Sequence, residues 1–300
     1  MSPVGRGVTL SVLASILFGA MYYLSAQLAP LDGAQIFGWR MLLTVPLLTA
    51  FLWWGGDWQL VRATAARLRR EPALWLVLPA SAALLGVQLW LFLWAPPNGR
   101  ALEVSLGYFM LPLSMVLTGR WVYGERLTRL QQLAAGCAAA GVLHELWRVG
   151  HFSWPAAVVV AGYPLYFVLR RHYRTDHLGG LWFDLLLMLP PAAALALAGA
   201  GASVFAGRPL LGLLVPLLGV ISAGALVSYI LSSRLLPLGL FGLLGYVEPV
   251  LLVAVALLLG ERIAPGQAWT YGPIWLAVCL LAGDGLRRAP PPQAPCPPRE

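Results

Sequence analysis

GYFMLPLSMVLTGRWVYGER, residues 107–126, and GYVEPVLLVAVALLLGER, residues 245–262, carry the same marker residues in the same order. Each stretch opens on Gly-Tyr, holds one proline among its first six residues and ends on Gly-Glu-Arg. The apolar part of each is long enough to cross a bilayer as a helix, which takes about 20 residues. This similarity indicates that one unit occurs twice in the chain.

A second pair of markers supports the duplication. Arg40 precedes Pro46 by six positions, and Asp184 precedes Pro190 by six positions. In both matches the partners lie five apolar stretches apart. Because five is odd, equivalent helices must cross the membrane in opposite directions. The two halves are therefore predicted to be inverted repeats.

The whole chain divides into ten apolar stretches, each about as long as a transmembrane helix. We expect them near residues 7–29, 35–56, 72–95, 101–122, 129–147, 153–171, 178–200, 209–231, 237–259 and 267–287. The predicted fold is an all-α polytopic membrane protein with ten transmembrane helices in two inverted five-helix repeats. The first repeat covers residues 1–147 and the second residues 148–288. The Pro-rich residues 289–300 are expected to form a disordered cytoplasmic tail.

Composition indicates that lipid surrounds most of this chain. Hydrophobic residues make up 59% of the 300 positions and charged residues only 11%, whereas soluble domains carry about 25% charge. The mean hydropathy is +0.76. A soluble chain with a net charge of +8 would suggest nucleic-acid binding, but here the basic residues are all arginines in the short polar gaps between apolar stretches. That distribution favours a lipid bilayer as the partner and argues against nucleic acid.

The arginines also predict orientation, because cytoplasmic loops carry the excess of positive charge. With the N-terminus in the cytoplasm, fifteen arginines fall on the cytoplasmic side: Arg6, Arg62, Arg67, Arg69, Arg70, Arg120, Arg126, Arg129, Arg170, Arg171, Arg174, Arg234, Arg287, Arg288 and Arg299. Four fall on the other side: Arg100, Arg148, Arg208 and Arg262. Both termini are therefore expected in the cytoplasm.

Charges inside apolar stretches are costly and usually face the bundle interior or a water-filled cavity. The main cases are Arg40, Asp184 and Glu248. Arg40 and Asp184 fall near opposite ends of their spans, roughly 12 Å apart in depth. A direct bridge between them is not expected, and Arg40 could instead reach Glu103 at the outer start of the fourth span.

Glu248 falls near the middle of the ninth span, immediately before Pro249. Proline lacks a backbone donor and leaves a carbonyl of the preceding turn without its partner. A carboxylate beside such a carbonyl suits a proton or a cationic substrate group; a buried pair or hydrogen-bonded network is an equally open interpretation. Pro112 and Pro249, near Tyr108 and Tyr246, are expected to kink two helices that face each other across a cavity, the alternative being kinks that only shape packing.

The third span carries Gln88 and Trp90, which could supply a hydrogen-bonding group and an aromatic surface to the same cavity. Gly239, Gly242 and Gly245 recur every three residues, which favours close packing of two helices. Residues 62–71, RATAARLRRE, are expected to form a short amphipathic helix on the anionic inner surface of the membrane. The sequence contains no metal-ligand set, nucleophile–base pair or phosphate loop, so no metal, cofactor or enzymatic activity is predicted.

Several of these segments resemble the RarD-type permeases of the drug/metabolite transporter superfamily, the EamA-domain proteins. The similar text is WAPPNGRALEVSLGYFMLPL (94–113), YGERLTRLQQLAAGCAAAGV (123–142), LGYVEPVLL (244–252) and the segment around Arg40. The resemblance implies ten helices in two inverted EamA repeats in the bacterial inner membrane. It also implies export or exchange of small metabolites without ATP hydrolysis.

Individual positions both match and depart from the pattern of that family. The matching positions are Arg40, Ser105, Tyr108, Pro112 and Glu125. The family usually carries Asn-Trp in the third span, His before the arginine of the second span and Asn before the proline of the fourth. This chain has Gln88 with Leu89-Trp90, Trp39 and Leu111 at those positions.

The leading hypothesis is a secondary transporter, an exporter or exchanger of a small organic metabolite or drug that works by alternating access, with protons as a candidate coupling ion. The alternatives are a membrane-embedded enzyme acting on a hydrophobic substrate and a non-transporting sensor subunit; channels can also contain inverted repeats. The predicted substrate-binding residues are Arg40, Gln88, Trp90, Ser105, Tyr108, Pro112, Asp184, Tyr246, Glu248 and Pro249.

Overall fold

The computed structural model describes residues 2–94, 101–150, 154–198, 204–258, 266 and 268–288, so the Pro-rich tail lies outside it. Over these ranges the chain is helical and contains no strand, which confirms the all-α class. The helices are α1 (Pro3–Ser25), α2 (Gly33–Trp54), α3 (Trp58–Arg70), α4 (Leu74–Trp94), α5 (Ala101–Tyr123), α6 (Arg129–Val149), α7 (Trp154–His172), α8 (Leu178–Leu197), α9 (Val204–Gly207), α10 (Leu211–Leu235), α11 (Leu238–Leu244), α12 (Val247–Leu258) and α13 (Ala268–Arg288).

Several of these helices have the length and composition of membrane spans. Within the described residues, α1, α2, α4, α8 and α10 are long and apolar enough to cross a bilayer. Shorter apolar helical stretches run over Leu238–Leu251 and Ala268–Leu281. The chain is therefore a multi-pass membrane protein.

Helix starts are fixed locally, because the first backbone N–H groups of a helix have no partner within it. At α2 the Asp32 carboxylate accepts the N–H of Gln35 at 2.8 Å, and the Gln35 side chain accepts the N–H of Asp32 at 3.1 Å. Thr128 and Gln131 form the same reciprocal pair at the start of α6. Such capping boxes fix where a helix begins.

The ninth stretch, expected as one kinked span over residues 237–259, is instead two helices separated at Gly245 and Tyr246. Pro249 cannot donate to the Gly245 carbonyl, and that carbonyl accepts the N–H of Glu248 at 3.3 Å. The expectation that a carbonyl would be left without a partner is therefore wrong for Gly245. The interruption places Glu248 and Pro249 in the first turn of α12, where a missing N–H costs least.

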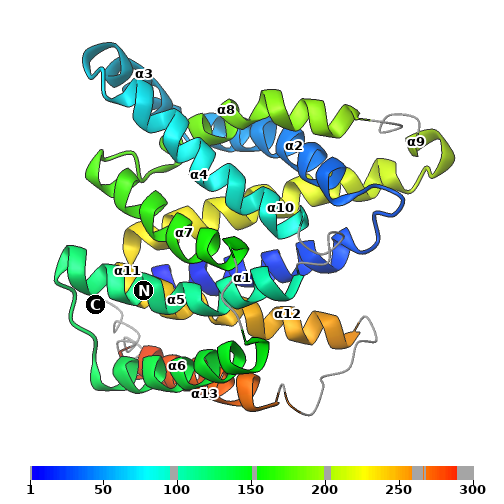
Figure 1. Cartoon of the computed structure of the whole chain (residues 1–300). Coiled ribbons are helices and arrows are strands. Elements are labelled where there is room, and N and C mark those ends of the chain that lie inside the picture. Colours follow the sequence, from blue (N-terminus) through cyan, green and yellow to red (C-terminus); the bar gives the residue numbers. More distant parts are fainter. Residues whose placement is uncertain are drawn as a thin grey trace, which may run out of the picture.

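The amphipathic helix expected near residues 62–71 is present as α3. It packs against α8, with Val61 and Thr64 buried, while Arg62, Arg69 and Arg70 are exposed. Figure 1 shows α3 at one end of the bundle, beside the chain reversal into α4.

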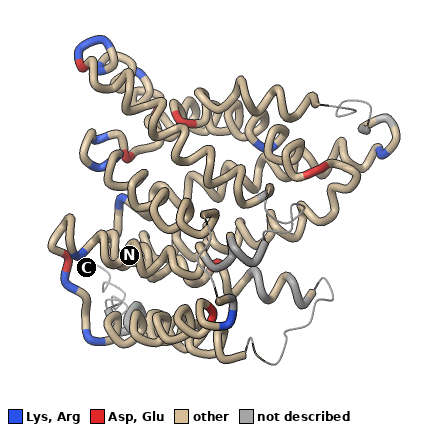
Figure 2. Tube along the Cα trace, in the orientation of Figure 1, with Lys and Arg blue, Asp and Glu red and all other residues tan. Residues whose placement is uncertain are grey.

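The remaining long helices lie side by side (Figure 1). The closest neighbours are α1 with α10 and α12, α2 with α8 and α10, α4 with α7 and α8, α5 with α7 and α11, and α6 with α13. Figure 2 shows most basic residues at the end of the bundle where α1 begins.

Glycines let α11 approach α5 closely. A Cβ on Gly242 would lie 2.4 Å from the Cβ of Met115 and 3.1 Å from the Pro112 carbonyl oxygen. A Cβ on Gly239 would lie 3.7 Å from the Cα of Val116. The packing role expected for this glycine stripe is confirmed.

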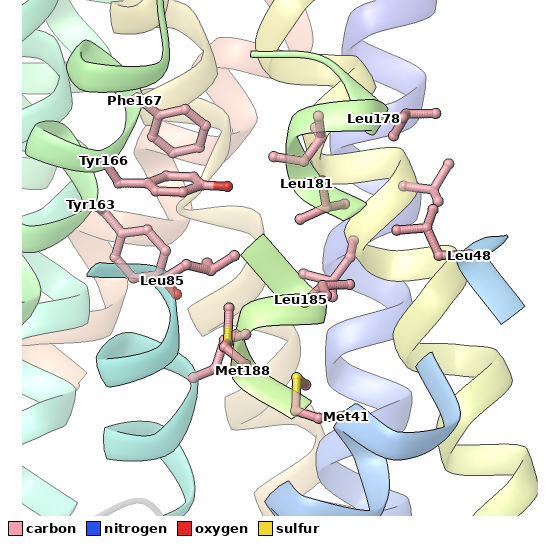
Figure 3. Close-up of a cluster of buried hydrophobic side chains, with 14 of the residues drawn as sticks. Met41, Leu48, Leu85, Tyr163, Tyr166, Phe167, Leu178, Leu181, Leu185 and Met188 are labelled. Carbon is pink, nitrogen blue, oxygen red and sulfur yellow. The ribbon is translucent and has the colours of Figure 1, made fainter. Parts of the chain in front are cut away.

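The largest buried apolar cluster joins α2, α4, α7 and α8 with parts of α5, α10 and α11. Figure 3 shows Tyr163, Tyr166 and Phe167 projecting from α7 toward Leu181 and Leu185 of α8. This cluster forms one wall of the central cavity described next.

Candidate functional site

A cavity lies at the centre of the bundle. It offers about 80 Å³ to the centres of water-sized molecules, whereas a single water needs roughly 10–15 Å³ by the same measure. Its walls come from α1, α2, α4, α5, α7, α8, α10, α11 and α12, and none of its described lining residues belongs to α6 or α13. The cavity has room for several waters or part of a small solute.

Sequence-predicted residues from three distant helices meet at this cavity. Arg40 of α2, Tyr108 and Pro112 of α5, and Glu248 and Pro249 of α12 all line it. The fold therefore brings these five together although they lie far apart along the chain.

Arg40 is buried, with 1% of its surface exposed. Its Nε donates to the Ser222 hydroxyl of α10 at 2.8 Å, and the Thr44 hydroxyl lies 3.0 Å from the same oxygen. Its Nη2 has no hydrogen-bond partner in the described part of the chain. No described carboxylate forms an ion pair with it, and the side chain of Glu103, its expected partner, lies outside the described structure.

Glu248 lines the same cavity as Arg40. The two side chains interact electrostatically but form no direct ion pair. A cation and an acid thus line one cavity without forming a direct ion pair.

Aromatic rings cover much of the remaining wall. The Tyr108 ring lies 5.6 Å from that of Phe92 and 6.2 Å from that of Tyr163, centroid to centroid. On α10 and α11, the rings of Tyr229 and Phe241 are 4.8 Å apart. Such surfaces bury apolar and aromatic groups well, and the tyrosines add polar hydroxyls.

Asp184 does not line the cavity but belongs to a buried polar network beside it. Its Oδ2 is 3.1 Å from Nη1 of Arg170 and accepts the Tyr166 hydroxyl at 3.0 Å. Ser81 of α4 donates to its other oxygen, and Arg170 also donates to Tyr166. Because Tyr166 lines the cavity, this network connects the cavity wall to the end of α7.

Arg170 further anchors the turn between α7 and α8. Its Nε donates to the Thr175 carbonyl at 3.0 Å and its Nη2 to the His177 carbonyl at 2.8 Å. The side chains of Arg170 and Asp184 are each 1% exposed. The ion pair and these hydrogen bonds together compensate the cost of burying the Arg170 guanidinium.

Other predicted residues lie away from the cavity. Gln88 donates from Nε2 to the Val158 carbonyl at 2.9 Å between α4 and α7, and its Oε1 has no partner in the described structure. Trp90 stacks on Trp94 with ring centroids 5.1 Å apart. The Tyr246 hydroxyl donates to the Phe109 carbonyl at 3.0 Å inside a separate apolar cluster.

The side chain of Ser105 lies outside the described structure, so its predicted role stays a prediction. Sequence reasoning did not single out Tyr163, Tyr229 or Ser222, which contact the cavity or Arg40. The sequence analysis placed Arg170 only among the cytoplasmic arginines and did not predict its buried pairing with Asp184. The spacing of Tyr166 and Arg170, four residues apart and therefore on one helix face, was the available signal.

The helices and the cavity between them define a multi-pass membrane transporter, and comparisons with known proteins agree. The model of the EamA-like transporter family matches residues 5–144. The chloramphenicol-sensitive protein RarD of Pseudomonas aeruginosa is 49% identical over 285 residues, covering 94% of this chain and 95% of that protein. An uncharacterized transporter of Pasteurella multocida is 38% identical, covering 94% of this chain and 97% of the relative.

More distant proteins also align with this chain over nearly their full length. Protein RarD of Salmonella typhi is 29% identical over 94% of this chain and 96% of its own length. A crystal structure with 18% identity superimposes with a TM-score of 0.65 over 95% of this chain and 99% of the other, which shows a shared fold. The chain belongs to the EamA-like transporter family, as a RarD-type permease. It is thus a transporter and not an enzyme.

Proposed function

We propose that this protein is a secondary transporter that exports or exchanges a small organic metabolite or drug by alternating access. The observation that carries the proposal is the central cavity, which is lined by Arg40, Glu248 and aromatic side chains from helices of both halves of the chain. Concave, mostly apolar sites with a few convergent polar groups are typical of small-molecule binding.

The proposed architecture has ten spans: α1, α2, α4, α5 and α6 in a first repeat (1–147), and α7, α8, α10, the pair α11 and α12, and α13 in a second (148–288). Support comes from the packing partners. Replacing each span by the one five places later turns the α1–α10 contact into α7–α4, α2–α10 into α8–α4, and α5–α7 into α12–α1. The contacts α2–α8, α5–α11 and α6–α13 map onto themselves. Inverted repeats related in this way can exchange conformations and open a central site to either side.

The proposed orientation has both termini in the cytoplasm of a cell that carries the protein in its inner membrane. The clustering of arginines at the end where α1 begins, visible in Figure 2, supports this orientation through the positive-inside rule. Cysteine labelling of single-cysteine variants from either side of the membrane tests it. Labelling near residue 2 only from outside would contradict it.

At the proposed cytoplasmic end, hydrogen bonds connect the two halves. Arg170 and Asp184 join α7 to α8, and Ser81 of the first half donates to Asp184. Glu125 of the first half accepts the backbone N–H groups of Leu238 and Gly239 of the second half, both at 2.7 Å. These contacts favour a conformation closed toward the cytoplasm, which the alternating-access cycle must release.

Glu248 is the proposed group for proton coupling, because it is the described carboxylate on the cavity wall. The test uses purified protein in liposomes, with counterflow of a panel of amino acids, nucleosides and antibiotics under an imposed pH gradient. The panel includes chloramphenicol, for which the Pseudomonas relative is named. We expect saturable flux of at least one compound, driven by the pH gradient in the native protein and independent of it in Glu248→Gln.

Asp57→Asn, a change in the turn before α3, is the matched control and should keep the pH-driven flux. Unchanged pH dependence in Glu248→Gln would remove this residue from coupling. Absence of saturable flux for every compound would contradict transport itself and favour a sensor role.

A further inference from the structure

Arg40, the cationic side chain on the cavity wall, has a hydrogen-bond donor without an acceptor in the described part of the chain. Ser222 satisfies only the Nε of Arg40, and Nη2 has no partner among the described residues. An arginine that is 99% buried is costly unless charge or hydrogen bonds compensate it. Neutral hydroxyls supply hydrogen bonds here but no negative charge.

The position of Arg40 is also distinctive. Its side chain lines the central cavity together with Met21 of α1 and Phe92 of α4. On the side toward Ser25 and Ile36 the same three residues pack closely and leave no room for a water. The guanidinium is therefore approached from the central cavity.

The chemistry of the wall limits what this guanidinium can recognise. A guanidinium presents a planar set of donors that matches the two oxygens of a carboxylate. Glu248 faces the same cavity, so a dianion such as a phosphate monoester would meet one positive and one negative group. Phe92, Tyr108 and Tyr163 offer surface for a flat apolar body.

Building on the proposed transport function, we propose that Arg40 is the specificity-determining residue of the site and binds the carboxylate of a small organic monoanion with an apolar, ring-sized body. In this arrangement the solute supplies the directly bonded negative charge that no described residue gives Arg40. Neutral and cationic analogues of the same shape leave the guanidinium unpaired and are selected against.

The test compares three probes with one carbon skeleton: phenylacetate, its neutral amide phenylacetamide and the cation 2-phenylethylamine. Binding to purified full-length protein is measured by calorimetry, so membrane permeation of the probes does not matter. We expect phenylacetate to bind at least tenfold more tightly than either analogue. Arg40→Gln should abolish the preference, whereas Arg234→Gln, a change at an exposed arginine of α10, should keep it.

A conservative variant separates charge from geometry. Arg40→Lys keeps the charge but loses the planar donor set, so phenylacetate should bind several-fold more weakly while still being preferred. If Arg40→Gln does not fold, Arg40→Lys and Ser222→Ala carry the test, because both keep a cation in the cavity and alter how it is presented; unchanged affinity in both would overturn the proposal.

Equal binding of the three probes, or no binding of phenylacetate, would also overturn this proposal even if counterflow of another solute is intact. Loss of counterflow for all solutes, with phenylacetate still bound through Arg40, would instead contradict the transport function. The two failures are therefore distinguishable.

Discussion

The Glu125 carboxylate accepts a hydrogen bond from the backbone N–H of Gly239 at 2.7 Å, so a side chain from the segment after α5 caps the start of α11. Its other oxygen accepts the N–H of Leu238, also at 2.7 Å. Arg171 at the end of α7 lies 3.8 Å from the same carboxylate. The Gly-Glu-Arg marker of the first repeat thus ties the connection between α5 and α6 to the beginning of a broken span in the other half.

Replacing Glu125 by Ala should loosen this end of the bundle. Two backbone donors would lose a charged acceptor, and hydrogen bonds to charged groups contribute about 1.5–3 kcal/mol each. We expect a lower thermal stability of the purified protein, together with faster thiol labelling of a cysteine introduced at Leu238. Arg126→Gln changes the neighbouring exposed charge and should leave both readouts unaltered; an equal loss in that variant would argue against a specific cap.

The Arg170–Asp184 pair should behave as one buried unit. Asp184→Asn leaves the guanidinium uncompensated in the interior, which costs about 3–5 kcal/mol in buried pairs. The double variant Arg170→Gln/Asp184→Asn should lose less stability than the sum of the two single variants, measured by unfolding in mixed micelles.

The Arg67–Glu71 pair supplies the contrast. Its oxygen and nitrogen lie 2.8 Å apart, but both side chains are partly exposed. Glu71→Gln should change stability little, because water screens exposed pairs.

For the buried pair, the contradicting outcome is additivity. If the stability losses of Arg170→Gln and Asp184→Asn simply add in the double variant, the contact between Arg170 and Asp184 contributes no coupling energy.

Acidification should destabilise the protein through His177, which precedes α8. Its Nδ1 accepts the N–H of Gly180 at 3.2 Å as a helix cap. Burial, followed by the nearby charges of Arg170 and Arg234, lowers the pKa of His177 from 6.5 to about 4. Because the unfolded chain takes up this proton first, the stabilising contribution is present above pH 6.5 and is lost as the pH falls from 6.5 toward 4.

The variant His177→Asn isolates this effect, since asparagine is a good helix cap that does not titrate. We expect the melting temperature of the native protein to fall more steeply between pH 7 and pH 5 than that of the variant. Parallel pH profiles would exclude His177 as the source.

The close crossing of α5 and α11 should not tolerate a side chain at Gly242. An added Cβ would meet the Met115 Cβ at 2.4 Å, and overpacking of this kind costs about 1–3 kcal/mol. Gly242→Ala should therefore lower the melting temperature and reduce counterflow. Gly136→Ala is the matched control, because nothing lies within 4 Å of its Cβ position; there a gain of about 0.5–1 kcal/mol in helix stability is expected.

Features that depend on neighbours along the chain were predictable from the sequence. Helix class, the amphipathic α3 and the packing role of the glycine stripe all follow from composition and spacing over a few residues. The interruption of the ninth span was only partly predictable: Pro249 signalled a weak point, but the helix breaks at Gly245 and Tyr246.

The interior partners of polar groups were decided by the tertiary structure. Arg40 and Ser222 are 182 positions apart, and Ser81 and Asp184 are 103 apart. No local pattern selects such partners, because they depend on which helix faces turn toward each other when the bundle closes. For the same reason Gln88 and Trp90 could not be assigned to the cavity or excluded from it until α4 was packed against α7 and α8.

The Gly-Tyr, Pro and Gly-Glu-Arg markers of residues 107–126 and 245–262 illustrate the difference between what the sequence predicts and what tertiary packing decides. The sequence alone determined that they recur, since residue order is fixed along the chain. Only the tertiary structure decided that Glu125 of the first set caps the helix that leads into the second, because a cap between distant segments requires packing to bring a carboxylate to free backbone donors.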